Sequence, residues 1–332
     1  MARYINDQNK VVLIHESGTY SSVSGVGIWP GQVTDISISD NENKLVNRYL
    51  GTSSRDYGVI VPGPRDVTGT LTLHAQDMRL AFWAIGSNVD TADGAIQSHT
   101  VTEVGTDKWL NPFTSGTGNQ RAPMSFTLED SKQAPGTGRN FIRTVNGCTS
   151  NTVTVTASQG EKVTVETDFI GQTLTPSSGT TTSITEQTNR PYLWSDCTLT
   201  VAGSVLSTPK EVSLEINNNM EAPHYLNGSR DIAAPFVQNK DYILSVTADF
   251  EADLADMLYN TIYKSNASVN VAFDLDADTS TGSQHTAFAL SGCKITSMEV
   301  PSPSDGVNET TIEFRPKSVT AYAWDSVKYN PW

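Results

Sequence analysis

An internal repeat is the feature that most constrains how this chain folds. Residues 33–86 and 210–262 run through the same events in the same order: an alternating strand, an Asx-rich turn, a polar loop with an Arg-Asp pair, a second strand and a short helix. Such self-similarity indicates a structural unit that occurs twice. Alternation in the first strand predicts one buried and one solvated face. Its apolar positions are Ile36 and Ile38 in one segment and Val212, Leu214 and Ile216 in the other.

Each segment ends in a predicted helix. The apolar positions with helical spacing are Met78, Ala81, Phe82 and Ile85 in the first segment and Leu254, Met257 and Leu258 in the second. Asp77 and Asp253 come just before these positions, where a carboxylate caps a helix and meets the positive end of its dipole. We therefore expect two short helices, each with one apolar face packed across a sheet.

The similarity continues beyond the helices. Residues 124–129 match residues 271–276, and a Gly-Cys pair follows in both halves, at 147–148 and 292–293. A further pair of strands is predicted after each Gly-Cys pair. The order of strands, helix and strands therefore occurs twice, which predicts two tandem domains of mainly β structure. We place the first domain at residues 1–171, a linker at 172–190 and the second domain at 191–332.

Three segments lie outside the repeated core. The N-terminal arm, residues 1–28, and an insert in the first domain, residues 87–123, have no counterpart in the second half. The insert is rich in Gly, Thr, Asp and Asn, but it carries Trp109, Leu110 and Phe113, and a long loop in a compact domain usually has a function. The linker is a Ser/Thr/Gly/Pro tract, which we expect to be flexible or extended.

Charge and cysteine content limit the classes of function. The formal net charge is −14, whereas a protein that grips DNA or an anionic membrane would be basic. No apolar stretch approaches membrane-spanning length or forms the core of a signal peptide, so we expect a soluble protein without a membrane partner. Cys148 and Cys293 occupy equivalent places in two domains and Cys197 has no counterpart. We expect three reduced, buried thiols, which fits a cytoplasmic compartment.

No catalytic, cofactor-binding or metal-binding pattern emerges, and we expect the chain not to be an enzyme. The five histidines are scattered without metal-ligand spacing, and no nucleotide-binding loop or nucleophile motif occurs. Asp274, Asp276 and Asp278 resemble the start of a calcium loop, but Thr279 and His285 stand where such a loop needs glycine and an acidic residue. We interpret this triplet as a strand end that runs into a solvated turn.

Aromatic residues near the C-terminus have two interpretations of equal weight. Trp324 and Trp332, with Tyr322 and Tyr329, either anchor an interface or cover the core of their own domain. The residues that we predict at an interface are Trp109, Leu110, Phe113, Trp324 and Trp332.

The second half resembles the tail tube proteins of long-tailed phages and related viruses. The resemblance is carried by PYLWSDCTLTVAG, EVSLEINNNMEAPHYLNGSRD and DLADMLYNTIY, and its most specific part is LEINNNME, residues 214–221, followed by the turn at 228–230. It is clearest over residues 191–314 and extends more weakly to the first half. It implies a domain of two packed β-sheets, a β-sandwich or barrel, with one flanking α-helix.

The resemblance also implies an assembly. Domains of this family associate side by side, so that their strands close into a barrel around a lumen, and the rings stack into a tube through which the genome leaves. Since family tubes have six domains per ring, a duplicated chain predicts a homotrimeric, pseudo-hexameric ring. An acidic lumen, with Glu215 as a candidate lining residue, would let viral DNA pass without specific binding. The implied partners are tail terminator, tape measure and distal tail proteins, and the implied location is the virion tail, assembled in the host cytoplasm.

Two alternatives remain open from the sequence. The chain could be another tail component, such as a distal tail or tail-terminator protein that reuses the same domain. It could also be a carbohydrate-binding β-sandwich module, because it combines aromatic residues with Asx-rich loops. For a tube subunit, the arm or the insert is the segment that we expect to make contacts between rings.

Overall fold

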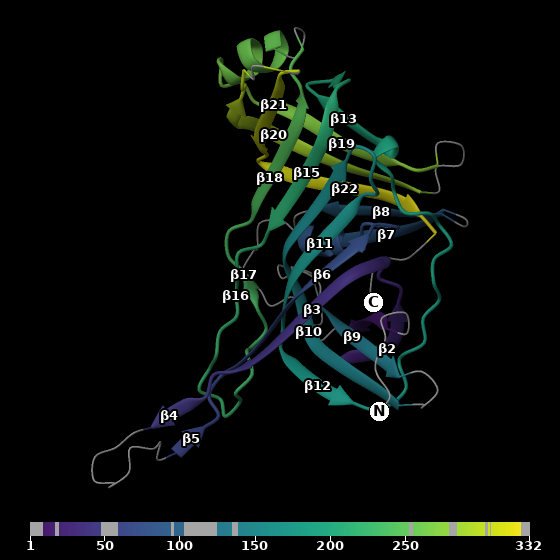
Figure 1. The fold of residues 1–332 in the computed structure, drawn as a ribbon, viewed down its shortest axis with the longest axis vertical. Helices are drawn as coiled ribbons and strands as arrows, with labels where there is room; N and C mark the ends of the chain where they lie inside the picture. The colour runs from purple at the N-terminus through teal and green to yellow at the C-terminus, as the bar shows by residue number, and fades with distance from the viewer. Residues whose placement is uncertain are drawn as a thin grey trace.

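The computed structural model has a mainly β fold with short helices, as the sequence predicts (Figure 1). The structure describes residues 9–16, 20–47, 59–93, 96–102, 125–134, 139–251, 255–278, 284–302, 305 and 307–326. Antiparallel pairing accounts for all the named strands. No helix among these residues is long and apolar enough to cross a membrane.

One continuous sheet, here called the main sheet, runs through both halves of the chain. Its strand order is β3, β6, β11, β10, β15, β18, β21, β20. The bounds are β3 Gln32–Glu42, β6 Arg65–His74, β11 Thr164–Gly171, β10 Arg139–Ser158, β15 Pro209–Asn217, β18 Asp241–Asp249, β21 Glu309–Arg315 and β20 His285–Glu299. The pairing of β10 with β15 joins the first half, β1 to β12, to the second half, β13 to β22.

Two smaller sheets complete the halves. The first contains β2 (Val23–Ile28), β1 (Lys10–Glu16), β9 (Ser125–Ala134), the N-terminal part of β10 and β12 (Thr173–Ser177). The second contains β14 (Ser204–Val205), β13 (Cys197–Val201), β19 (Val269–Asp276), the N-terminal part of β20, and β22 (Ser318–Asp325). In the second sheet, β8 (Ile96–Thr102) and β7 (Ser87–Asp93) extend the edge beyond β22.

Strand pairing follows the same scheme in the two halves. In the main sheet, β3–β6 corresponds to β15–β18, β6–β11 to β18–β21 and β11–β10 to β21–β20. In the smaller sheets, β10–β9 corresponds to β20–β19, β9–β1 to β19–β13, β1–β2 to β13–β14 and β10–β12 to β20–β22. The Gly-Cys pairs fit this scheme. Gly147 and Gly292, with φ of 66° and 64°, take the left-handed conformation just before Cys148 and Cys293, which glycine adopts without steric cost.

Helix α1 (Arg79–Ile85) differs from the expected one-sided helix. Every residue of α1 is buried, because residues of both halves surround it. Trp83 lies 5.6 Å from Phe126 and Phe82 lies 6.0 Å from Phe288, measured between ring centroids. Asp77 accepts a hydrogen bond from the Arg79 amide at 3.1 Å, close to its predicted capping role, although Met78 is the residue at the helix boundary.

The second helical segment, η3 (Ala255–Tyr263), is wound as a π-helix and packs on β20. Leu258 and Ile262 are buried, whereas Thr261 is exposed. Its predicted cap, Asp253, lies outside the described residues. This helix therefore has the one-sided burial that we expected of both.

The three segments assigned outside the repeated core are partly built into the sheets. In the expected arm, β1 and β2 pair as a hairpin on β9, and Leu13 and Ile14 are buried. The insert begins with the β7–β8 hairpin, and the expected linker begins with β12 and continues as extended chain along the first half. Thr182 in that chain donates its amide and hydroxyl to the buried carboxylate of Glu129 at 3.0 and 2.8 Å.

Candidate assembly surfaces

The face of the main sheet that points away from the core is polar and mostly acidic. Its strands alternate, so that Val153, Leu214 and Val246 are buried while their neighbours in sequence face the other way. Those neighbours are largely Thr and Ser. The acidic side chains on this face include Asp35, Glu166, Asp168, Glu211, Glu215, Glu299, Glu309 and Glu313, and the basic ones include Lys210, Lys294 and Arg315.

Two of the basic side chains on this face pair with carboxylates, and Lys294 donates to the amide oxygen of Asn266. Lys210 lies 2.6 Å from Asp249 and 2.5 Å from Glu309, and Arg315 lies 3.1 Å from Glu313. The carboxylates of Asp249 and Glu309, which form hydrogen bonds with Lys210, raise the pKa of its ammonium group. The unpaired excess on this face is therefore negative, and Glu215, the predicted lining residue, belongs to it.

The two outer edges of the main sheet are open. Among the described residues, β3 pairs only with β6, and residues 294–299 of β20 pair only with β21. At the far end of β3, Arg65 binds Asp40 at 2.7 Å and holds the pKa of that carboxyl below its usual range, chiefly through their hydrogen bond. Open edges present unpaired N–H and C=O groups, which favour pairing with another strand.

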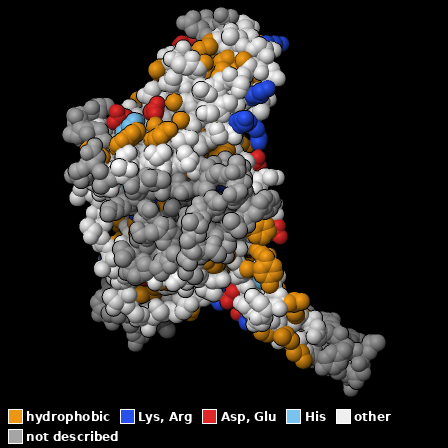
Figure 2. Space-filling model, turned by 180° about the vertical axis from the view of Figure 1, so that it is seen from behind, with side chains coloured by type: hydrophobic (Ala, Val, Ile, Leu, Met, Phe, Trp, Pro, Cys, Tyr) orange, Lys and Arg blue, Asp and Glu red, His pale blue; other side chains and the backbone are white. Residues whose placement is uncertain are grey.

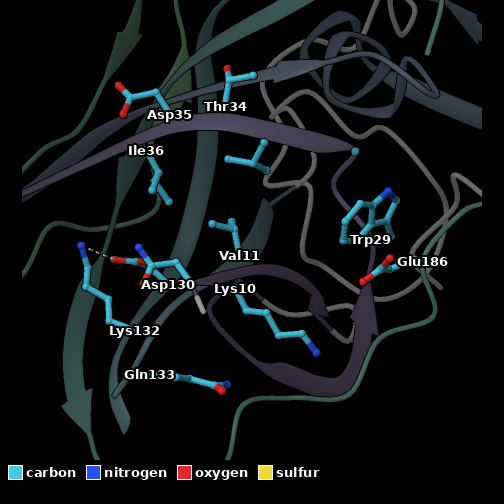
Figure 3. Close-up of a pocket in the computed structure, with 13 residues that line it drawn as sticks. Lys10, Val11, Trp29, Thr34, Asp35, Ile36, Asp130, Lys132, Gln133 and Glu186 are labelled. Carbon is cyan, nitrogen blue, oxygen red and sulfur yellow. Dashed lines mark ion pairs between the residues drawn. The ribbon is translucent and has the colours of Figure 1, made fainter. Parts of the chain in front are cut away.

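A groove of ≈ 590 Å³ lies beside the open edge of β3 (Figure 3). Thr34, Asp35 and Ile36 form one side of it, and Lys10 of β1 and Lys132 of β9 stand on the other. The second half has a smaller groove of ≈ 210 Å³ beside β15. That groove is lined in part by residues of the first half, Ala157 and Gln159, at the end of β10.

A hairpin with exposed apolar side chains extends from the ends of β3 and β6. It consists of β4 (Leu45–Asn47) and β5 (Val59–Val61), and it projects away from the sheets (Figures 1 and 2). Leu45 is 56% exposed and Ile60 is 55% exposed, and Val46, Val59 and Val61 are also exposed. We interpreted this region as a polar loop; the signal that could have identified the surface is the apolar run 59–61.

The second half has a corresponding hairpin, β16 (Met220–Glu221) with β17 (Phe236–Val237), which behaves differently. The chain between these strands lies against the base of the β4–β5 hairpin. Arg230 donates to the carbonyl of Gly63 at 2.9 Å and to Glu42 at 3.0 Å, and the Arg65 amide donates to the carbonyl of Arg230 at 2.9 Å. The loop of the second-half hairpin is thus held by the first half, whereas strands β4 and β5 project beyond these contacts.

The predicted interface residues are placed only in part. Trp324 is half-buried on β22, where its ring stacks on His285 at 4.9 Å. Its neighbours Ala323 and Asp325 are buried, so Trp324 lies on the face of β22 that points away from the core, and its role at an interface stays a prediction. Trp109, Leu110, Phe113 and Trp332 lie outside the described residues.

Among the described residues, no group of three His, Cys, Asp or Glu side chains could hold a metal ion. Asp274 and Asp276 lie on strand β19 rather than in a calcium loop, and burial raises the pKa of Asp274. All three cysteines are free thiols; Cys148 and Cys293 are buried, whereas Cys197 is half-buried. Burial raises the pKa of Cys197 to about 12 and that of Cys293 to about 11, which keeps both unreactive at neutral pH.

The sheets, the open edges and the hairpin together make a surface suited to self-association. Residues 18–318 match the model of one family, described as phage tail tube protein. No curated protein matches the chain. Because the family match spans most of the 332 residues, the chain belongs to the phage tail tube protein family.

Proposed function

We propose that three copies of this chain form a pseudo-hexameric ring of the tail tube, built from two tandem copies of one tube domain. The observation that carries this proposal is the identical pairing scheme of the two halves, which are joined edge to edge through β10 and β15. A unit that associates with its own duplicate inside one chain has a surface that suits the next chain as well. Since family rings hold six domains, three chains complete a ring.

The two open edges determine how neighbouring chains are oriented. The main sheet of each chain has β3 at one outer edge and β20 at the other. Because these two edges differ, each contact joins β3 of one chain to β20 of the next, in a head-to-tail arrangement. Head-to-tail contacts that close by rotation form rings, and closure removes the unpaired edges. The strands of the main sheet then form a closed β-barrel that surrounds a lumen.

The polar face of the main sheet suits the wall of a channel for DNA. Its excess of carboxylates repels phosphates, and Lys210 and Arg315 are paired with acidic side chains. DNA therefore gains little by releasing counterions on this wall and can pass during ejection without sticking. The net charge of −14 extends the same tendency to the whole subunit.

Stacking of rings is the role that the β4–β5 hairpin supports best. Exposed apolar side chains that project from the body of a soluble subunit indicate a contact with another protein. A second copy in the adjacent ring is the partner that a uniform tube supplies everywhere along its length. The ends of the tube would meet the tail terminator and the distal tail protein, the lumen would hold the tape measure protein, and assembly would precede host lysis in the cytoplasm.

Electron microscopy of the purified protein tests the tube. We expect long tubes whose cross-sections show six similar domains and whose rings have the mass of three chains. Isolated rings that do not elongate would favour a terminator or distal tail protein instead. Persistent monomers at high concentration would contradict both.

Charged substitutions in the β4–β5 hairpin test its role in stacking. Leu45→Asp with Ile60→Asp should leave single rings and abolish tubes, because burying two carboxylates at every ring contact costs several kcal/mol each. The matched control is Val23→Asp with Val205→Asp, two exposed apolar residues on strands β2 and β14. Tubes of normal length from the hairpin variant would exclude this hairpin as the stacking contact.

A further inference from the structure

We infer that the joint between neighbouring chains repeats the β10–β15 joint inside the chain, with Glu299 of one chain directly opposite Ser39 of the next. The outer edge of β20 thus pairs antiparallel with the outer edge of β3 of a second copy. This inference rests on the ring proposed above and specifies its contact. It follows from the correspondence of strands between the two halves, taken residue by residue.

The bulges fix the correspondence of β3 with β15. The ladder of β3 with β6 shifts between Val33 and Asp35, and that of β15 with β18 shifts between Pro209 and Glu211. A bulge inserts one residue and therefore marks a position along a strand. Val33 thus corresponds to Pro209, and Ser39, six residues on, corresponds to Glu215.

The correspondence of β10 with β20 is fixed in the same way. The ladder with β11 shifts between Ser150 and Thr152, and the ladder of β20 with β21 shifts between Ile295 and Ser297. Thr154 therefore corresponds to Glu299. Inside the chain Thr154 stands opposite Glu215, so the same joint between chains places Glu299 opposite Ser39.

The alternating direction of backbone hydrogen bonds supports this joint, even though Pro301, which lacks an N–H, stands beside it. At the internal joint, the Gln159 amide donates to Lys210 and the Asn218 amide donates to Asn151, both at 2.8 Å. Pairing alternates along an antiparallel ladder, so the odd-numbered residues of β10 are the ones bonded to β15. Their counterparts at the open edge are residues 296, 298, 300 and 302. Pro301 falls between them, and the N–H that it lacks would have pointed away from the joint.

The side chains at this joint are also compatible. Val300, 36% exposed in the single chain, comes opposite Ile38, which is half-buried and packs against the core. Their counterparts Val155 and Leu214 are fully buried at the internal joint. Ile38 also accepts a long 3.5 Å hydrogen bond from Arg143, but a carbonyl has a second lone pair for the neighbouring strand.

The grooves agree with the same arrangement. Ala157, at the end of β10, lines the small groove beside β15, and its counterpart Ser302 would reach the larger groove beside Ile36. A second copy of the chain is thus the occupant that explains why one groove is wide and the other narrow. The wall of the groove in Figure 3 would be completed by the neighbouring chain.

Cysteine cross-linking tests the register. Residues at a non-hydrogen-bonded position lie about 4.5 Å apart between Cα atoms, within the range of a disulfide, whereas a shift of two residues takes them to about 7–8 Å. In assembled tubes, Ser39→Cys with Glu299→Cys should give covalent dimers and trimers at least tenfold more than Ser37→Cys with Glu299→Cys. The matched internal control, Thr154→Cys with Glu215→Cys, should form its disulfide within one chain.

The outcomes separate this inference from the function. Tubes that cross-link no better in the expected register than in the shifted one overturn the joint and leave the tube intact. Failure of the unmodified protein to form rings or tubes overturns the function itself. If the cysteine variants do not assemble, a reconstruction of the unmodified tube gives the register directly, and any partner of Glu299 other than Ser39 refutes the inference.

Discussion

Glu16 shows how a single buried carboxylate ties together neighbouring strands of the smaller sheet in the first half. Its side chain is fully buried and accepts hydrogen bonds from the amides of Ser21 and Gly147, at 2.8 and 2.7 Å, and from the hydroxyls of Ser125 and Thr127, at 2.5 and 2.9 Å. These donors come from the β1–β2 connection, from β9 and from β10, where its ladder with β9 shifts between Val145 and Cys148. A carboxylate is suited to this place because it accepts on both oxygens and donates on neither.

Glu16→Gln should therefore destabilise the folded chain without changing its shape. The amide keeps one accepting oxygen and turns its NH₂ group toward donors, so buried donors lose their partners at a cost of about 2–4 kcal/mol in the free energy of unfolding. Urea denaturation of the unassembled subunit measures this change. The control, Glu211→Gln at an exposed position, should stay within about 0.5 kcal/mol. Equal midpoints for the two variants would show that the Glu16 hydrogen bonds contribute little.

At the scale of elements, the open edge of β20 can be tested apart from the fold. The ladder of β20 with β21 ends at the pair Glu299 and Thr311, so the amide of Val300 has no role in it. Val300→Pro removes an N–H only from the proposed joint, and the preceding residue is already in a strand, as proline requires. The isolated subunit should unfold at an unchanged temperature, while rings should need at least about tenfold more protein to form.

Pro301→Ala supplies the control for this prediction. It restores an N–H that points away from the joint, so ring formation should be unchanged. Sedimentation velocity across a concentration series measures both variants. Equal assembly of Val300→Pro and the unmodified chain would argue against pairing at this edge.

The sequence predicted those elements in which the spacing of apolar residues along the segment determines which side chains are buried. Val212, Leu214 and Ile216 alternate, and they form a strand with one buried face. The position of helix α1 was expected, but its burial on all sides was not. That burial comes from parts of both halves that pack around the helix, and the spacing of apolar residues within 78–85 carries no information about them. The β1–β2 hairpin escaped prediction because its counterpart, β13–β14, has an unrelated sequence and shares only its pairing.

The assembly surface was less predictable than the core. Apolar side chains in a strand normally indicate burial, yet Leu45 and Ile60 are exposed because their hairpin extends beyond the sheets. The acidic face was predicted through Glu215, since alternation places that residue opposite the core. The open edges could not be located from the sequence, because an edge is defined by which strand is missing beside it.

At the scale of the whole molecule, the joint within the chain is stronger than the proposed joint between chains. Besides β10 and β15, the halves share the pairing of β8 with β22, where the buried His99 contacts Asp325 at 3.1 Å. The segment of the second half that corresponds to the insert is too short to supply such a hairpin to a neighbour. A ring under stress should therefore open into intact chains, with the two halves of each chain still joined.

The charge of the proposed lumen gives the last prediction. Glu166→Lys with Glu215→Lys changes the polar face of the main sheet by four charges per chain, two for each substitution, and neither residue contributes to the core. Tubes should still form, but their wall now offers cations whose binding to phosphates releases counterions, so DNA should be retained at about 50 mM salt and released near 200 mM. Glu161→Lys with Glu251→Lys makes the same change at exposed positions outside the strands of the main sheet and should retain no DNA inside the tube. Retention is measured as the fraction of a short duplex that sediments with the tubes and stays protected from nuclease. If tubes of the unmodified chain retained as much protected DNA as the lysine variant, the acidic face could not be what lets the genome slide.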